Sequence, residues 1–256
     1  MSVTSIVLMY HNIASGRQNI VFREWQPAYD VAAEDFQTHL GLIEKHKAPV
    51  HVTFDDGYHS VLPWVETLQK HRIPATCFVT TSIVGQRGML QAAEIRTLAQ
   101  AGIRIGSHSH SHIFLQNLTP LQQQTEILTP RKILSDIIGQ DVTTMSLPGG
   151  RYDNGKLQYA GDCGYHEIYT STPGVRSRRL RHAPNLILVP RWVITQNVLL
   201  PEFETILRAE PWHLIKKRSR YFAGRLGKRF LGNQNYHMLW NKLHHPKTSS
   251  LAERDT

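Results

Sequence analysis

The sequence is poor in cysteine and has no long hydrophobic run. Its two cysteines, Cys77 and Cys163, cannot form the disulfide framework that is typical of small secreted proteins. No segment approaches the ~20 apolar residues that a membrane-spanning helix requires. The N-terminal segment, Met1–Tyr10, lacks a basic leader and is typical of a strand rather than of a signal peptide. These observations predict a protein of the reducing cytoplasm.

Acidic residues are missing from residues 211–252, which contain nine lysines and arginines. The whole chain has 29 basic and 20 acidic residues, so the rest of it is balanced and the net charge of +9 belongs to this segment. A generally basic surface for nucleic acid is therefore not expected, and no recognition motif accompanies the charge.

The same segment has an amphipathic pattern, because Ile215, Phe222, Leu226 and Phe230 lie near one helical face. We predict a basic, helical tail over residues 205–256. It would either pack on the main domain or make a peripheral contact with an anionic membrane surface or substrate carrier, at the inner face of the membrane.

Apolar segments of strand length alternate with segments of helical spacing over residues 1–204. The expected strands are Ile6–Tyr10, Val50–Phe54, Ala75–Thr80, Gly102–Gly106, Thr143–Leu147, Glu167–Thr170 and Leu186–Val189. The expected helices are Ala33–Lys45, Val61–His71, Gln91–Ala101, Leu121–Ile138 and Gly155–Asp162. This alternation predicts a parallel sheet covered by helices, as an α/β barrel or a doubly wound layer.

Two neighbouring carboxylates, Asp55 and Asp56, directly follow the expected strand Val50–Phe54. A pair of aspartates in a loop is usually a turn or a helix cap. This pair lies at the carboxyl end of a strand, where α/β folds place their sites, and Gly57 permits a sharp turn there. Two acids so close do not easily share one role. We therefore expect one of them to bind a cation and the other to act as a base.

A run of histidines follows the expected strand Gly102–Gly106. In a helical turn, His108 and His112 would lie on one face and could hold the same ion, whereas His110 would point elsewhere. In an extended segment all three would share a face, so the local conformation decides the ligand set. A surface run without a role is the alternative. One carboxylate and two imidazoles suit a catalytic divalent metal, and the two clusters together indicate a metal-dependent hydrolase.

The Thr-Phe-Asp-Asp-Gly segment at 53–57 and the His-Ser-x-x-His segment at 108–112 resemble the first two motifs of the polysaccharide deacetylases. This is the NodB-homology or carbohydrate esterase family 4 group. The resemblance extends over about residues 5–195 and includes Ile73–Val79, Leu98–His108, Ser146–Asp153 and Cys163–Tyr165. It implies a distorted (β/α) barrel that hydrolyses the N-acetyl group of a sugar with a divalent metal, Zn²⁺ or else Co²⁺ or Ni²⁺.

The resemblance also implies roles for individual residues. Asp56, His108 and His112 would bind the metal, and Asp55 would be the general base toward the attacking water. A backbone N–H of the Pro148-Gly149-Gly150 loop would stabilise the oxyanion.

Two departures from the family pattern are present. The third motif usually has an arginine two residues before the proline, where this chain has Ser146. Arg191 could supply the missing cation near Asp55, or it could be an ordinary residue at the end of the barrel. The late Leu-x-His motif that supplies the general acid is also absent.

A candidate for that acid lies at the other end of the chain, in the Val-Leu-Met-Tyr-His segment that ends at His11. First and last strands are neighbours in a closed barrel, so a permuted strand would bring His11 to the same place. This resembles permuted members that act on poly-N-acetylglucosamine-type exopolysaccharides. His11 would then protonate the departing amine, or it is a structural histidine at a strand end.

The leading hypothesis is thus a carbohydrate N-deacetylase acting on an amino sugar in a glycan or lipid-linked saccharide. The alternatives are a hydrolase of a small non-sugar amide on the same fold and a degenerate glycan-binding module. One further segment, Thr172–Asn185, contains four arginines at 176, 178, 179 and 181. It forms either a rim for an anionic substrate or a solvated loop.

Overall fold

The computed structural model describes residues 5–14, 20–46, 49–116, 118–181 and 183–231. Within them, one nine-stranded sheet has the order β11-β1-β4-β5-β6-β7-β8-β10-β9. Its strands are β1 (Ile6–Tyr10), β4 (Val50–Phe54), β5 (Ala75–Val79), β6 (Arg104–Ser107), β7 (Thr144–Ser146), β8 (Glu167–Tyr169), β9 (Arg178–Arg179), β10 (Ile187–Val189) and β11 (Trp192–Val193). Neighbouring strands are parallel except for β9, which runs antiparallel to β10.

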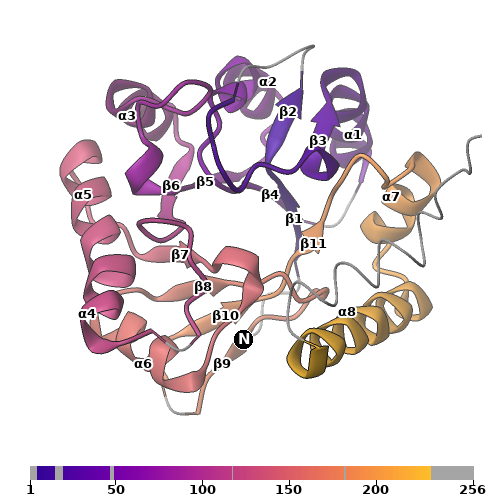
Figure 1. The fold of residues 1–256 in the computed structure, drawn as a ribbon. Helices are drawn as coiled ribbons and strands as arrows, with labels where there is room; N and C mark the ends of the chain where they lie inside the picture. The colour runs from indigo at the N-terminus through magenta and orange to yellow at the C-terminus, as the bar shows by residue number, and fades with distance from the viewer. Residues whose placement is uncertain (1–4, 15–19, 47–48, 117, 182, 232–256) are drawn as a thin grey trace, which may run out of the picture. The chain divides into compact units, whose positions relative to one another are not determined.

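The sheet curves into a half-barrel with helices on its outer side (Figure 1). The helices of this part are α1 (Ala33–Lys45), α2 (Val65–Lys70), α3 (Ala92–Gln100), α4 (Pro120–Gln123), α5 (Thr129–Ile138), α6 (Asn154–Asp162) and α7 (Leu200–Leu207). A π-helical turn, Gln124–Leu128, joins α4 to α5, and a small sheet pairs β2 (Asn12–Ala14) with β3 (Asp30–Ala32). The predicted α/β barrel is confirmed, and all seven expected strands form.

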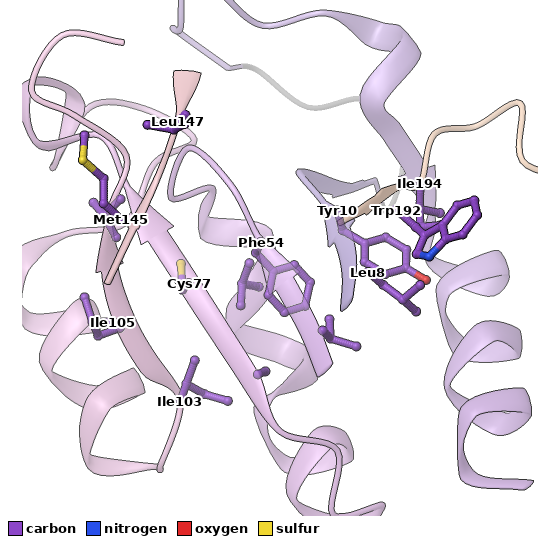
Figure 2. Close-up of a cluster of buried hydrophobic side chains, with 14 of the residues drawn as sticks. Leu8, Tyr10, Phe54, Cys77, Ile103, Ile105, Met145, Leu147, Trp192 and Ile194 are labelled. Atoms are coloured by element: carbon purple, nitrogen blue, oxygen red, sulfur yellow. The ribbon is translucent and has the colours of Figure 1, made fainter. Parts of the chain in front are cut away.

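Side chains alternate along a strand, so the two faces of the sheet carry different sets of residues. On the outer face, Leu8, Tyr10 and Phe54 belong to the large core beneath the helices (Figure 2). On the inner face, a smaller buried cluster is made of Val7, Phe78, Tyr169 and Val189. Polar side chains that emerge at the carboxyl end of the inner face therefore stand above an apolar interior.

The first strand lies beside the last one, as the sequence analysis expected. Leu8 of β1 is paired with Trp192 of β11, and Tyr10 is paired with Phe54 of β4. The residues that follow β1 and β4, His11 and Asp55, are consequently neighbours at the same end of the sheet. The β11 strand was not predicted, since it is only two residues long.

Contacts divide the chain into two compact units, Met1–Leu214 and Ile215–Thr256. The predicted boundary after residue 204 falls inside α7, whose Phe203, Ile206 and Leu207 are buried in the core. The assignment of two domains stays a prediction. The next helix, α8, spans Pro211–Leu231. Residues 232–256 of the predicted tail lie outside the described residues. None of the helices in the described part has the length and apolarity needed to cross a membrane.

Candidate active site

The turn after β4 places two buried carboxylates at the end of the barrel. The Asp55 N–H donates to the Tyr10 carbonyl at 2.9 Å and so extends the pairing with β1. Asp56 and Gly57 then have φ of +74° and +88°. This conformation costs a non-glycine residue roughly 1–3 kcal/mol and is typical of functional sites. At Gly57, an added Cβ would lie 3.2 Å from Val79 Cγ1, so a larger residue would disturb the turn.

The histidine segment adopts neither of the two conformations considered from the sequence. The His108 N–H donates to the Val79 carbonyl at 2.8 Å, and the chain then bends through left-handed φ values of +65° at Ser109 and +60° at His112. This bend turns the rings of His108 and His112 to the same side, with centroids 5.0 Å apart.

Glu126 fixes this bend, and the sequence analysis did not identify it. Its carboxylate accepts hydrogen bonds from the N–H groups of His110 and Ser111, at 3.1 and 2.9 Å, and from Ser111 Oγ at 2.6 Å. The His110 ring instead contacts Thr81 Oγ1 at 2.9 Å, away from the other two histidines. Glu126 is buried, in the π-helical turn, and a single acid in a helical pattern gives no sequence signal of such a contact.

Asp56, His108 and His112 form a group that could hold a metal ion. Asp56 Oδ1 lies 3.4 Å from His108 Nε2 and 3.3 Å from His112 Nε2. Each of the three residues offers one ligand atom, and these three atoms lie within 4.8 Å of one another. The three residues named from the family motifs are therefore brought together.

The chemistry of the group fits a divalent cation. Asp56 Oδ1 is buried and lacks a hydrogen-bond partner among the described residues. Burial, and then the neighbouring charge of Asp55, raise the pKa of Asp56, and a cation bound here would favour the ionised carboxylate. Burial lowers the pKa of His108 to about 3, which keeps the ring neutral. Its Nδ1 lies 3.1 Å from the Ser146 carbonyl, and this contact leaves Nε2 directed at Asp56 as a ligand atom.

Arg191 pairs with Asp55 inside the barrel. The guanidinium donates to both carboxylate oxygens, at 2.6 and 2.8 Å, and Nη2 also donates to Ser146 Oγ at 2.6 Å. The Ser146 hydroxyl in turn donates to Asp55 Oδ2 at 2.9 Å. Burial by itself would raise the pKa of Asp55, but Arg191 and His108 hold it well below its usual range. The sequence left open whether Arg191 lies near Asp55 or is an ordinary residue at the end of the barrel, and the structure places its guanidinium beside Asp55.

His11 lies at the end of β1, next to Asp55 in the sheet register. Its ring is 4.4 Å from the ring of Tyr29, and its Nδ1 is buried without a hydrogen-bond partner among the described residues. Burial lowers the pKa of His11 to about 4, with Asp55 acting in the opposite direction. His11 is therefore neutral at pH 7, and its role as general acid stays a prediction.

The loop predicted to stabilise the oxyanion is a tight 3₁₀ turn, Pro148–Gly150, that directly follows Leu147. The Gly150 N–H is used within the turn, since it donates to the Leu147 carbonyl at 2.8 Å. Since proline has no N–H, the N–H of Gly149 is the remaining donor of the three-residue loop. A Cβ at Gly149 would lie 2.4 Å from the Phe114 ring, so the close approach of that ring requires glycine.

Comparison with known proteins agrees with the motifs. The family model for polysaccharide deacetylase matches residues 43–168. YxkH of Bacillus subtilis, which is described as a polysaccharide deacetylase, is 33% identical over 184 residues, 67% of this chain and 66% of the relative. The chain belongs to the polysaccharide deacetylase family. A second family member, the peptidoglycan-N-acetylmuramic acid deacetylase PdaA of B. subtilis, is 31% identical over 142 residues, 51% of this chain and 52% of that protein.

Solved structures of the family share the fold. The deacetylase PplD of Streptococcus pyogenes, solved in complex with acetate, matches with a TM-score of 0.67 and 22% identity, over 82% of this chain and all of that chain. IcaB of Ammonifex degensii matches with a TM-score of 0.61 and 20% identity, over 80% of this chain and 97% of that one. At these identities the likeness concerns the half-barrel alone.

Proposed function

We propose that this protein is a metal-dependent hydrolase that removes N-acetyl groups from an amino sugar of a glycan or lipid-linked saccharide. The observation that supports it best is the joint position of two groups at one end of the barrel. Asp56, His108 and His112 converge on one point, and Asp55 is held beside them by Arg191. Relatives named as deacetylases of peptidoglycan and of chitooligosaccharide supply the substrate class, an N-acetylated saccharide.

The metal would supply a Lewis acid that polarises the acetyl carbonyl and activates water. Zn²⁺ is the ion proposed, because two imidazoles and a carboxylate are among the ligand sets it accepts in catalytic sites. Asp56 and the two histidines are its proposed ligands, and His108 is oriented for this by its contact with the Ser146 carbonyl.

The remaining steps belong to residues of the chain. Asp55 would take a proton from water at a carboxylate oxygen, with Arg191 and Ser146 holding that carboxylate in place. The Gly149 N–H would donate to the developing oxyanion. Cleavage of the C–N bond gives acetate and an amine, and the amine needs a proton. His11 is neutral at rest, so it has no additional proton to supply. We propose that it passes the proton taken from water on to the departing amine.

The test is acetate release from N-acetylglucosamine oligosaccharides, with metal content measured on the same samples. Chelation is expected to lower the rate at least about 100-fold, because the Lewis acid and the activated water are lost together. His108→Ala should lose the stoichiometric metal and the activity. The matched control is His110→Ala, whose ring contacts Thr81 instead of the other histidines, and it should keep both.

Each alternative function has its own outcome in this test. Metal binding without acetate release from any saccharide, but with hydrolysis of a small amide, would indicate the non-sugar amidase. Absence of both metal and activity would indicate the degenerate module. One argument for the degenerate module was that Ser146 replaces the arginine of the third family motif. Arg191, which pairs with Asp55, argues against it, because it places a cation beside that carboxylate.

We also propose a peripheral contact of α8 with an anionic membrane surface, and with it a location at the membrane. Trp212, Ile215 and Phe222 are exposed and fall within about 80° of one another around an ideal helix of 3.6 residues per turn. The charged side chains of α8 are all basic, and the Arg218 guanidinium lies 5.9 Å from the Phe222 ring. An apolar stripe with basic flanks is the pattern of helices that lie in the membrane interface.

Flotation of the full chain with vesicles tests this proposal. Binding to phosphatidylglycerol-containing vesicles should exceed binding to pure phosphatidylcholine and should fall as salt is raised. Trp212→Ser combined with Phe222→Ser should lower binding about tenfold or more, because two large apolar side chains are lost. Leu121→Ser is the control, since Leu121, an apolar residue of α4, is 74% exposed. Equal binding to both kinds of vesicle would contradict the proposal.

A further inference from the structure

A cavity lies at the end of the barrel opposite to the candidate active site. It has a volume of about 510 Å³, within the range of roughly 300–1,000 Å³ that is usual for small-molecule sites. Its lining includes the first residues of three strands, Arg104 of β6, Glu167 of β8 and Ile187 of β10. The catalytic carboxylates and histidines follow the last residues of their strands. The cavity therefore opens at the amino-terminal end of the sheet and is not part of the site described above.

Apolar side chains separate the two ends. Val7, Tyr169 and Val189 line the cavity and, together with Phe78, form the buried cluster of the inner face. The rings of Phe78 and Tyr169 also lie 5.5 and 5.9 Å from the guanidinium of Arg191, which pairs with the catalytic Asp55. A ligand in the cavity would thus be isolated from the metal ligands by a packed layer.

The arginine-rich segment, Thr172–Asn185, contributes to this cavity. Arg178 and Arg179 form β9, which pairs antiparallel with β10, and both line the cavity with Ser177. The sequence analysis considered this segment as a rim for an anionic substrate or as a solvated loop. The register of β9 places it with the amino-terminal ends of the parallel strands, because Arg179 is opposite Ile187, the first residue of β10.

The cavity has an excess of positive charge. The one carboxylate among the described lining residues, Glu167, is already matched, since it pairs with Arg104 at 2.5 Å and accepts a hydrogen bond from the Tyr169 hydroxyl at 3.1 Å. Neither Arg178 nor Arg179 forms an ion pair with any described residue, and the Arg179 guanidinium donates to the Pro184 carbonyl. Two guanidinium charges beside the cavity are therefore without an anionic partner among the described residues.

We propose that this cavity binds a small organic anion of about the size of a phosphorylated monosaccharide. Arginine side chains pair with phosphate and carboxylate through parallel N–H donors, and Arg178 and Arg179 would supply them. Val7, Ile187 and the Tyr169 ring provide apolar surface for the uncharged part of the ligand. His51 leaves the charge balance unchanged, because burial lowers its pKa to about 4 and its Nε2 contacts Thr76 Oγ1 at 2.8 Å.

Calorimetric titration of the full chain, treated with chelator so that the catalytic end holds no metal, tests the proposal. The probes are glucose 1-phosphate, glucuronate and uncharged glucose. At least one of the two anions should bind about tenfold or more tightly than glucose. Which of them binds more tightly decides between phosphate and carboxylate recognition.

Variants show whether the binding belongs to this cavity. Arg178→Ala combined with Arg179→Ala should weaken anion binding at least about tenfold, because both unmatched donors are lost. The matched control is Arg176→Ala, which removes an exposed arginine of the same segment that does not line the cavity. An equal loss in the control, binding that survives the double variant, or no preference for an anion over glucose would each overturn the proposal. Circular dichroism of the variants verifies the fold, and the binding titration does not depend on the proposed activity.

Discussion

Replacing Asp55 by asparagine is expected to lower kcat for acetate release about 10³-fold. General base catalysis contributes roughly 10²–10⁴-fold, and an amide cannot accept the proton. The substitution preserves shape, and an asparagine oxygen can still accept a hydrogen bond from Arg191, which lies 2.6 and 2.8 Å from the two oxygens of Asp55. The buried Arg191 loses its anionic partner, so the variant should be less stable, but the Asp56, His108 and His112 group should persist in the folded protein.

Metal content separates this effect from a loss of the metal site. The Asp55→Asn variant should keep stoichiometric metal, whereas His108→Ala should lose it. Asp141→Asn is the matched control, because Asp141 is an exposed carboxylate that pairs with Arg131, outside the proposed site. Full activity of the Asp55→Asn variant would exclude Asp55 as the general base. Loss of metal together with loss of activity would show that the substitution also damages the metal site, and would contradict a role for Asp55 that is separate from metal binding.

Much of the fold and of the site follows from sequence patterns that act locally. Val50–Phe54 is a short apolar segment, and the aspartates after it had to emerge at a strand end, which is where they lie. The helix Ala33–Lys45 was predicted with its observed bounds, because its apolar residues repeat at helical spacing. Such elements are determined by neighbours in the chain.

The features that were not predicted depend on residues far apart in sequence. The bend of the histidine segment is held by Glu126, and the β11 strand exists because two residues find β1 as a neighbour. The place of Arg178 and Arg179 at the opposite end of the barrel depends on the antiparallel pairing of β9 with β10. Residue types and spacing do not determine such contacts, because they arise only when distant segments of the chain meet in the folded protein.

Replacing Arg191 by methionine is expected to have the largest effect on stability. Arg191 is fully buried and donates hydrogen bonds to Asp55, Ser146, Thr53 Oγ1 and the Thr170 carbonyl. Its removal leaves Asp55 as an uncompensated buried charge, for which the cost is about 3–5 kcal/mol in the free energy of unfolding. Chemical denaturation of the variant and of the wild type at pH 7 measures this loss.

The pH dependence identifies the cause of this loss. In the wild type, the pKa of Asp55 is held below its unfolded value, so the stabilisation by this carboxylate is present at neutral pH and persists until the pH falls below the usual range of aspartate. Without Arg191, burial raises the pKa of Asp55 above its unfolded value, and the carboxylate destabilises the variant as pH rises. The gap between variant and wild type should consequently be smaller at pH 4.5 than at pH 7.

A double variant separates the lost pair from the stranded charge. Asp55→Asn together with Arg191→Met removes both charges, so it should be more stable at pH 7 than Arg191→Met alone, although it lacks more of the native hydrogen bonds. If the double variant is less stable than Arg191→Met, then lost packing and the bonds of Arg191 to Thr53 and Thr170 explain the effect instead. A double variant that is more stable than Arg191→Met would mean that Arg191 serves to keep the buried Asp55 carboxylate ionised. The proposed catalysis requires this, because Asp55 can accept a proton from water only in its ionised form.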